Sequence, residues 1–128
     1  MSRVPVDTSI WIEYFRDSRR HSVVDELIIG NIVCTNDLIL AELIPAIQVR
    51  REKELIESLL AITRYELEID WNQIIQMQVT NIEHGLNRVG IPDLIIIENV
   101  LANDLILFTA DRHFKLMQRY FSFMLYKE

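Results

Sequence analysis

The sequence predicts an α/β fold in which a mostly parallel central sheet of about five strands lies between two layers of helices. Short apolar segments rich in β-branched residues alternate along the chain with longer segments whose apolar residues recur at helical spacing. Most strand segments are continuous apolar runs, which is typical of a parallel sheet covered on both faces. With 128 residues, 50% of them hydrophobic and 25% charged, the chain is expected to form one domain over residues 1–128.

The first half of the chain is expected to contain three strands and four helices. Pro45 is expected to bend or interrupt the third helix, because a proline inside a helix removes a hydrogen bond. Alternating apolar and acidic residues over 65–69 predict a strand with one face in water. In chain order, the elements are a strand over 4–6, a helix from about residue 10 capped by Thr8 or Ser9, a loop or frayed helix end over 16–20, a helix over 22–29 stopped by Gly30-Asn31, a strand over 31–35, a helix capped by Asn36 or Asp37, a helix over 51–61 and a strand over 65–69.

The second half begins with a helix that Asp70 caps and that runs towards Gly90. Its apolar residues follow helical spacing, and Trp71, like Trp11, is expected to lie in the core. The next helix opens at Pro92 and is apolar nearly all round over residues 94–97, which indicates a helix packed deep in the fold. A central strand over 105–109, a short helix after Asp111 and an edge strand over 121–126 complete the chain.

Charge and composition exclude several classes of protein. The net charge of −6 argues against a nucleic-acid binder held by a large basic surface, but carboxylates that bind metal would contribute to such a charge in a nuclease. Cys34 is the only cysteine, so neither an internal disulfide nor a cysteine-based zinc site is expected. No charged and apolar leader is present, and no uncharged apolar run approaches the roughly 20 residues of a membrane span. We therefore expect a cytoplasmic protein without membrane contact.

Four acidic residues from distant segments are expected at one edge of the sheet. Asp7 directly follows the first strand, and Asp111 lies two residues past Thr109, at the end of the last central strand. Asp93 begins a helix at the same edge, and Glu42 lies about two turns into the helix after the second strand. Ligands of such sheets bind at the carboxyl ends of the strands, so these acids are expected to converge there.

A divalent metal explains why carboxylates would gather in this way. Unpaired carboxylates repel one another, and some would be forced to protonate. Mg²⁺ prefers oxygen ligands, typically with one or two carboxylates, and a bound metal activates water and stabilises charge on a phosphate. Asp93 and Asp111 could each merely cap a helix, so the metal site depends on the four acids together. An acidic site without His or Cys ligands favours phosphodiester hydrolysis over zinc chemistry.

The segments V-D-T-S-I-W at 6–11, A-E-L at 41–43, I-P-D at 91–93 and L-F-T-A-D-R-H-F at 107–114 resemble those of the PIN-domain family. Within that family, they are most similar to the VapC-type toxins of toxin–antitoxin pairs. The resemblance implies a three-layer PIN-like fold and a Mg²⁺- or Mn²⁺-dependent endoribonuclease that cleaves RNA with a metal-activated water. It also implies inhibition by a cognate antitoxin protein, which inserts into or covers the active site, and commonly a homodimer.

The resemblance also suggests roles for individual residues. Asp7 and Asp93 match the principal metal ligands, and Glu42 and Asp111 complete the catalytic quartet. Thr109 matches a hydroxyl that orients the site, and Ser9 or Thr8 is expected to act likewise beside Asp7.

Two cations flank the last acid of the quartet. Arg112 and Lys115 are candidate RNA contacts. His113 lies near the site and could touch substrate, but a local structural role is favoured. The chain departs from the family pattern at Pro45, close after Glu42, and at residues 96–98, where Ile-Ile-Glu replaces small residues.

Two other functions are compatible with parts of the pattern. A PIN-like module that binds RNA or a partner without cleavage would need no complete quartet, yet all four acids are present. A receiver-like phosphoacceptor domain would need an adjacent acidic pair after the first strand and a lysine after the last one. Here Asp7 stands alone, and Thr109 is followed by Ala-Asp, which argues against that interpretation.

Overall fold

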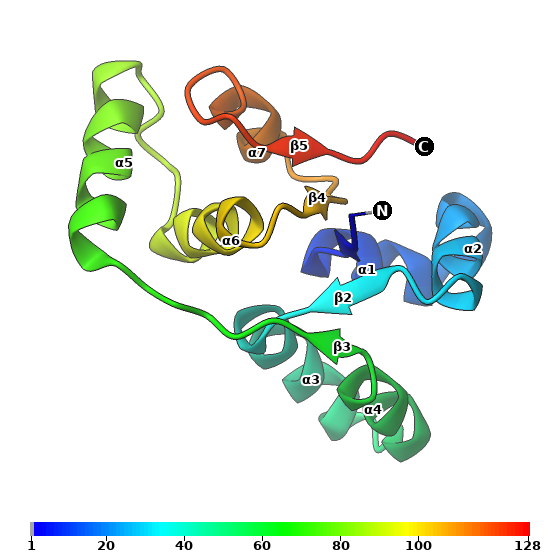
Figure 1. The fold of residues 1–128 in the computed structure, drawn as a ribbon. Helices are drawn as coiled ribbons and strands as arrows, with labels where there is room; N and C mark the ends of the chain where they lie inside the picture. Colours follow the sequence, from blue (N-terminus) through cyan, green and yellow to red (C-terminus); the bar gives the residue numbers. More distant parts are fainter. Residues whose placement is uncertain (1) are drawn as a thin grey trace.

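The structure, a computed structural model, describes residues 2–128 and contains five short strands and seven α-helices in that range (Figure 1). The strands are β1 Val4–Pro5, β2 Val33–Thr35, β3 Thr63–Arg64, β4 Ile106–Leu107 and β5 Met124–Leu125. The helices are α1 Thr8–Arg16, α2 Val23–Ile29, α3 Asp37–Val49, α4 Lys53–Leu60, α5 Trp71–Glu83, α6 Ile91–Ala102 and α7 Arg112–Met117, and a 3₁₀ turn, η1, covers Ser18–His21. None of these helices has both the length and the apolar character needed to cross a bilayer.

All strand pairs are parallel, as the sequence predicts. β1, β2 and β3 are hydrogen-bonded in the order β1-β2-β3, and β4 pairs with β5. A parallel bridge between Val6 and Phe108 joins the two groups, and the Phe108 amide donates to the Pro5 carbonyl at 2.9 Å. The combined order is therefore β3-β2-β1-β4-β5. The chain moves outward from β1 in one direction first and in the other direction afterwards, so the crevice between β1 and β4 is the topological switch point where ligands of such sheets bind.

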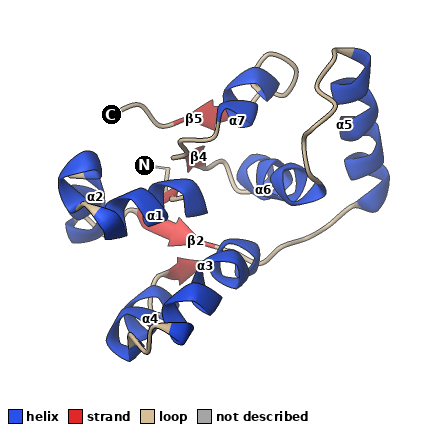
Figure 2. Ribbon diagram, turned by 180° about the vertical axis from the view of Figure 1, so that it is seen from behind, coloured by secondary structure: helices blue, strands red, loops and turns tan. Residues whose placement is uncertain are grey.

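Helices surround the strands (Figure 2). They also provide most of the buried apolar side chains of the core. α1 packs on α3, and α3 packs on α4, whereas α5 packs on α6. Every residue from Leu94 to Val100 in α6 is buried, so the expectation of a helix packed deep in the fold is confirmed. Burial all round explains why this helix lacks a polar face.

Helix α1 begins at Thr8, two residues before the expected start, so neither Thr8 nor Ser9 is its N-cap. Asp7 has the N-cap position but makes no capping hydrogen bond with its side chain. Its carboxylate is instead engaged by two hydroxyl groups, described below. Asp7 thus stands at the N-cap position, but its carboxylate does not cap the helix and is available to the site.

Helix α3 continues through Pro45 to Val49, so of the two expected effects, a bend or an interruption, the interruption does not occur. The proline removes the amide that would bond to the Ala41 carbonyl. Both Pro45 and Ala41 are exposed, so water can satisfy that carbonyl at little cost. The buried face of α3, which includes Leu43 and Ile47, is unaffected.

Residues 65–68 alternate in burial as expected, but Ile69 is 37% exposed, and residues 65–69 do not form a strand. Strand β3 lies just before them, and the Tyr65 amide donates to the Thr35 carbonyl at 2.9 Å as the last bond of that pairing. Tyr65 and Leu67 pack against the core, while Glu66 and Glu68 are exposed. The segment then leaves the edge of the sheet for α5 (Figure 1), so its backbone has no neighbouring strand to pair with.

Helix α5 ends at Glu83, before the expected end near Gly90, and the expected burial of Trp71 is wrong. Trp71 is 59% exposed, whereas Trp11 is 2% exposed, as expected. The buried face of α5 consists of Ile74, Met77 and Asn81. Apolar side chains therefore lie on two faces of α5. One face is buried and packs on α6, and the other is exposed.

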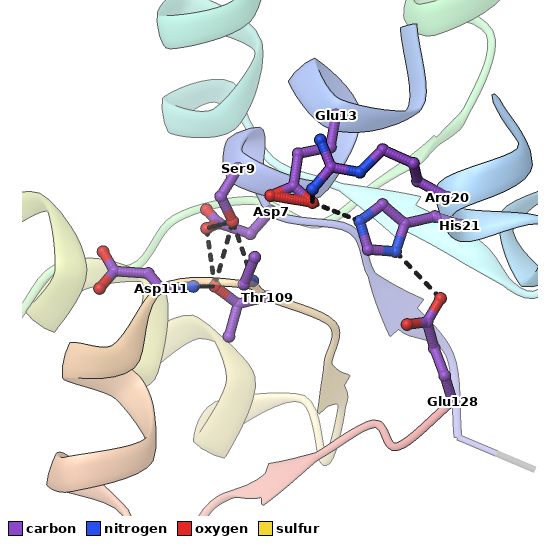
Figure 3. A network of polar contacts seen from close by, with 9 residues as sticks. Asp7, Ser9, Glu13, Arg20, His21, Thr109, Asp111 and Glu128 are labelled. Atoms are coloured by element: carbon purple, nitrogen blue, oxygen red, sulfur yellow. Dashed lines mark hydrogen bonds and ion pairs between the residues drawn. The ribbon is translucent and has the colours of Figure 1, made fainter. Parts of the chain in front are cut away.

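A histidine ties the end of the described chain to α1 (Figure 3). The buried His21 ring contacts the Glu13 carboxylate at 2.5 Å and the Glu128 carboxylate at 3.0 Å. Burial opposes protonation of this ring, but the two carboxylates outweigh that effect and raise the pKa of His21 above its ordinary value. The ring also packs edge-on against Phe108, beside the junction of β1 and β4.

Candidate metal centre

Asp7 occupies the switch point because it directly follows the bridge residue Val6. Its side chain is 6% exposed, and its Oδ2 atom accepts hydrogen bonds from Ser9 Oγ and Thr109 Oγ1, both at 2.9 Å (Figure 3). The two hydrogen bonds hold this carboxylate oxygen in place. The two hydroxyl groups predicted to support the site at Ser9 and Thr109 therefore both contact Asp7.

The same hydroxyl groups fasten the loop after β4 to the first turn of α1. The Ala110 amide donates to Ser9 Oγ at 3.0 Å, and the Asp111 amide donates to Thr109 Oγ1 at 3.0 Å. The hydroxyl oxygens of Ser9 and Thr109 lie 3.3 Å apart. This network fixes the position of Asp111 relative to Asp7, although the two residues come from opposite ends of the chain.

Asp93, Asp111 and His113 form a cluster in which one potential ligand atom from each lies within 4.8 Å of the others. Asp93 is in the first turn of α6, which Pro92 helps to start. Asp111 is the N-cap of α7 and accepts the His113 amide at 2.9 Å. This turn brings His113 Nδ1 to 3.3 Å from Asp111 Oδ1.

The predicted acids influence one another electrostatically. Burial raises the pKa of Asp93 to about 6, and the negative charges of Asp111, Asp7 and Glu42 act in the same direction, while His113 opposes them. The pKa of Glu42 is also raised, first by loss of hydration around its carboxylate and then by the charge of Asp7, with the Thr8 hydroxyl opposing. A divalent cation would relieve the repulsion between these carboxylates, which contributes to the raised pKa values of Asp93 and Glu42.

The structure thus brings three of the four predicted acids into one connected arrangement. Asp93 and Asp111 belong to the cluster, and Asp7 is linked to Asp111 through Thr109. Glu42 lies on an exposed part of α3 and interacts with the others through space. The buried Thr8 hydroxyl lies close enough to the Glu42 carboxylate to lower its pKa, but within the described residues it makes no hydrogen bond of regular geometry.

The sequence analysis places His113 near the site but does not count it among the potential metal ligands. A search for paired histidines at helical ligand spacing cannot find it, because it approaches Asp111 through a capping turn of two residues. A useful signal would have been its position in the first turn of a helix capped by a candidate ligand.

The donor set fits a divalent cation with a preference for oxygen. Carboxylates suit Mg²⁺ and Mn²⁺, and an imidazole nitrogen suits transition metals better than Mg²⁺. The raised pKa of Asp93 is consistent with a carboxylate whose ionised form a bound cation would stabilise. The expected cofactor, Mg²⁺ or Mn²⁺, is therefore compatible with these residues.

Comparisons with known proteins agree with this architecture. The family model of the PIN domain matches residues 4–120, a range that includes all four acids. DNA-bound VapBC from Salmonella typhimurium matches with a TM-score of 0.74 and 14% sequence identity, over 99% of this chain and 98% of that chain. VapBC2 from Rickettsia felis, bound to a DNA fragment from its promoter, matches with a TM-score of 0.67 and 19% identity, over 96% of each chain. The search of curated proteins found no match. At these identities, the structural likeness concerns the fold.

Proposed function

The chain belongs to the PIN-domain family, and from that premise we propose that it is a Mg²⁺- or Mn²⁺-dependent endoribonuclease. We further propose that it acts in the cytoplasm as the toxin of a type II toxin–antitoxin pair. The observation that carries the proposal is the cluster of Asp93, Asp111 and His113 beside the buried Asp7. Acids held together at a sheet edge suit a cation and a phosphodiester better than a signalling or purely structural role.

Each residue of the site would have a distinct part in this reaction. Asp7, Asp93 and Asp111 would hold the cation, which supplies an activated water and stabilises charge on the phosphate. Ser9 and Thr109 hold the Asp7 carboxylate in position through hydrogen bonds to its Oδ2 atom. Glu42 would help to orient the attacking water for in-line displacement at phosphorus.

The direct test uses the purified chain and a mixture of cellular RNAs. We expect cleavage products with either Mg²⁺ or Mn²⁺, and none after addition of EDTA, because chelation would leave the acids without the ion that activates water. A gel assay with labelled RNA measures the products. Cleavage in EDTA, or no cleavage with either metal, would overturn the proposal. In the second case, a titration that shows no Mn²⁺ binding would favour the non-cleaving RNA- or partner-binding module.

A groove beside Glu42 supports the proposed antitoxin partner. It has a volume of about 210 Å³, and its apolar lining includes Ile12, Phe15 and Leu43. Arg16 and Arg50 also line it, so it offers both apolar contact and positive charge next to an acid of the quartet. A segment of an antitoxin with apolar and acidic side chains would fit this chemistry and would cover the site.

The exposed face of α5 supports the proposed homodimer. Trp71, Ile75, Val79 and Ile82 are 40–60% exposed and recur at helical spacing. In Figures 1 and 2, α5 stands at the margin of the fold. Glu83 is the only charged residue of this helix, so two copies of the same face can meet without like-charge repulsion. We therefore infer that a second copy of the chain covers the exposed apolar face of α5.

The substitution Ile75→Glu should weaken this dimer by at least about 30-fold, because each copy would bury an unpaired charge in a central contact. The measurement is sedimentation equilibrium over a range of concentrations. Ile29→Glu is the matched control, since Ile29 is 84% exposed on α2, away from α5. An unchanged dimer in Ile75→Glu, or equal dissociation in both variants, would contradict the assignment of this face.

A further inference from the structure

A basic hollow runs along the exposed face of α7, next to the metal centre. Its volume is about 630 Å³, and it is lined by Arg112, Lys115, Leu116, Gln118 and Arg119. Three of these five residues are cations, in a chain where 19 acidic residues outnumber 13 basic ones. The hollow is thus a local exception to the overall negative charge.

The backbone explains why the three cations share one face. α7 ends at Met117, but the Gln118 amide still donates to the Phe114 carbonyl at 3.0 Å, and the Arg119 amide donates to the Leu116 carbonyl at 3.3 Å. The helical turn therefore continues far enough to place residues 112, 115 and 119 on the same side. Phe114 and Met117 are fully buried on the opposite side, which leaves the cations towards solvent.

These cations are not used for internal ion pairs. Within residues 2–128, the salt bridges of Lys and Arg involve Arg19, Arg20 and Arg64, and none involves a cation of the hollow. Three neighbouring positive charges without acidic partners produce a positive potential that attracts a polyanion. The Gln118 side chain donates to the Phe123 carbonyl at 3.1 Å, so it fixes one wall of the hollow.

The hollow also has the right position and length for a strand that enters the metal centre. Arg112 directly follows Asp111, a member of the acidic cluster. Seven residues of helical rise separate Arg112 from Arg119, which amounts to roughly 10 Å. That length corresponds to about three stacked nucleotides at a rise of roughly 3.4 Å each.

We propose that this hollow binds the phosphate backbone of single-stranded RNA over about three nucleotides next to the scissile bond, with Arg119 as its outermost contact. The inference rests on the proposed ribonuclease function and specifies how its substrate is held. The cations contact phosphates, and the partly buried Leu116 offers an apolar floor for a ribose or base. Affinity from such contacts does not depend on base sequence.

The test measures how salt weakens RNA binding in two matched double variants. Lys115→Gln/Arg119→Gln removes two charges from the hollow. Arg51→Gln/Lys53→Gln removes the same two residue types from exposed positions just before α4 and at its first residue. Arg112 is kept because it adjoins the metal centre. The probe is a fluorescein-labelled 12-nucleotide single-stranded RNA of mixed sequence, titrated in Ca²⁺ buffer at several NaCl concentrations and checked afterwards for intactness.

For a single strand, removing one cation that binds a phosphate should lower the slope of log K against log salt by about 0.7. We expect the hollow variant to show a slope smaller by about 1.4 and to bind roughly 25-fold more weakly at 0.1 M salt. The control variant should keep the wild-type slope, and circular dichroism should give equal melting curves. Equal slopes in the two variants, or a wild-type slope in the hollow variant, would overturn the inference.

The outcomes separate this inference from the proposed function, because binding is measured without cleavage. A wild-type chain that does not cleave RNA but shows the slope difference would refute the ribonuclease and leave the hollow as an RNA site. If the wild-type chain cleaves RNA but the two double variants show equal slopes, the ribonuclease proposal would stand and the hollow would be refuted as an RNA site.

Discussion

The substitution Asp93→Asn should reduce RNA cleavage by at least about a thousand-fold while the chain stays folded. Asparagine keeps the shape of the side chain but removes the negative charge from the centre of the acidic cluster. A bound metal stabilises the transition state by several kcal/mol, and a thousand-fold loss corresponds to about 4 kcal/mol. Initial rates with saturating Mn²⁺ and labelled RNA measure the effect.

The matched control for this substitution lies just beyond the other end of α6. Asp104 is exposed and has a positive φ of 52°, a conformation that asparagine adopts readily, so Asp104→Asn makes the same chemical change away from the site. We expect this variant to cleave RNA at the wild-type rate. Comparable activity in Asp93→Asn and Asp104→Asn would refute the role given to Asp93.

Mn²⁺ should stabilise the chain strongly at pH 7.5 and weakly at pH 5. The pKa of Asp93 is raised to about 6 in the folded, metal-free chain, whereas an unfolded aspartate has its ordinary value of 3.8. The folded state thus holds this proton more tightly, so the metal-free chain loses stability as pH rises from about 4 through about 6. Glu42, whose pKa is also raised, acts in the same direction.

The ionised carboxylates that destabilise the metal-free chain are the ones that a cation needs. At a Mn²⁺ concentration of 100 times Kd, binding contributes about 2.7 kcal/mol, which corresponds to roughly 10 °C in Tm for a chain of this size. Differential scanning fluorimetry of the EDTA-treated chain, with and without Mn²⁺ at both pH values, measures the shift. In Asp93→Asn, the shift at pH 7.5 should be much smaller. A Mn²⁺ shift of equal size at both pH values, or one that Asp93→Asn retains in full, would argue against this site.

The sequence predicts most of the architecture because burial leaves a clear pattern. Residues 94–97 are apolar on every side, and α6 is accordingly buried all round. Asp7 and Thr109 could be assigned to one edge because each follows a short strand in a parallel sheet, and the bond between their side chains agrees with that reasoning.

The features that could not be predicted depend on what surrounds each residue. Trp71 belongs to an apolar stripe of the expected period, but periodicity does not tell which of two apolar faces meets the core. The effect of Pro45 depends on whether water reaches the Ala41 carbonyl. His113 joins the acids only through the turn at Asp111, which spacing along a regular helix does not reveal.

The neighbouring positions of β1 and β4 delay assembly of the site during synthesis of the chain. Thr109 and Asp7 share a hydrogen bond although 102 positions separate them in sequence. At translation rates of roughly 5–20 residues per second, Asp7 waits about 5–20 s before its partner hydroxyl has been made. A nascent chain therefore carries no complete acidic cluster while most of it is being translated, and a product that terminates before Thr109 would lack the hydroxyl group that holds Asp7.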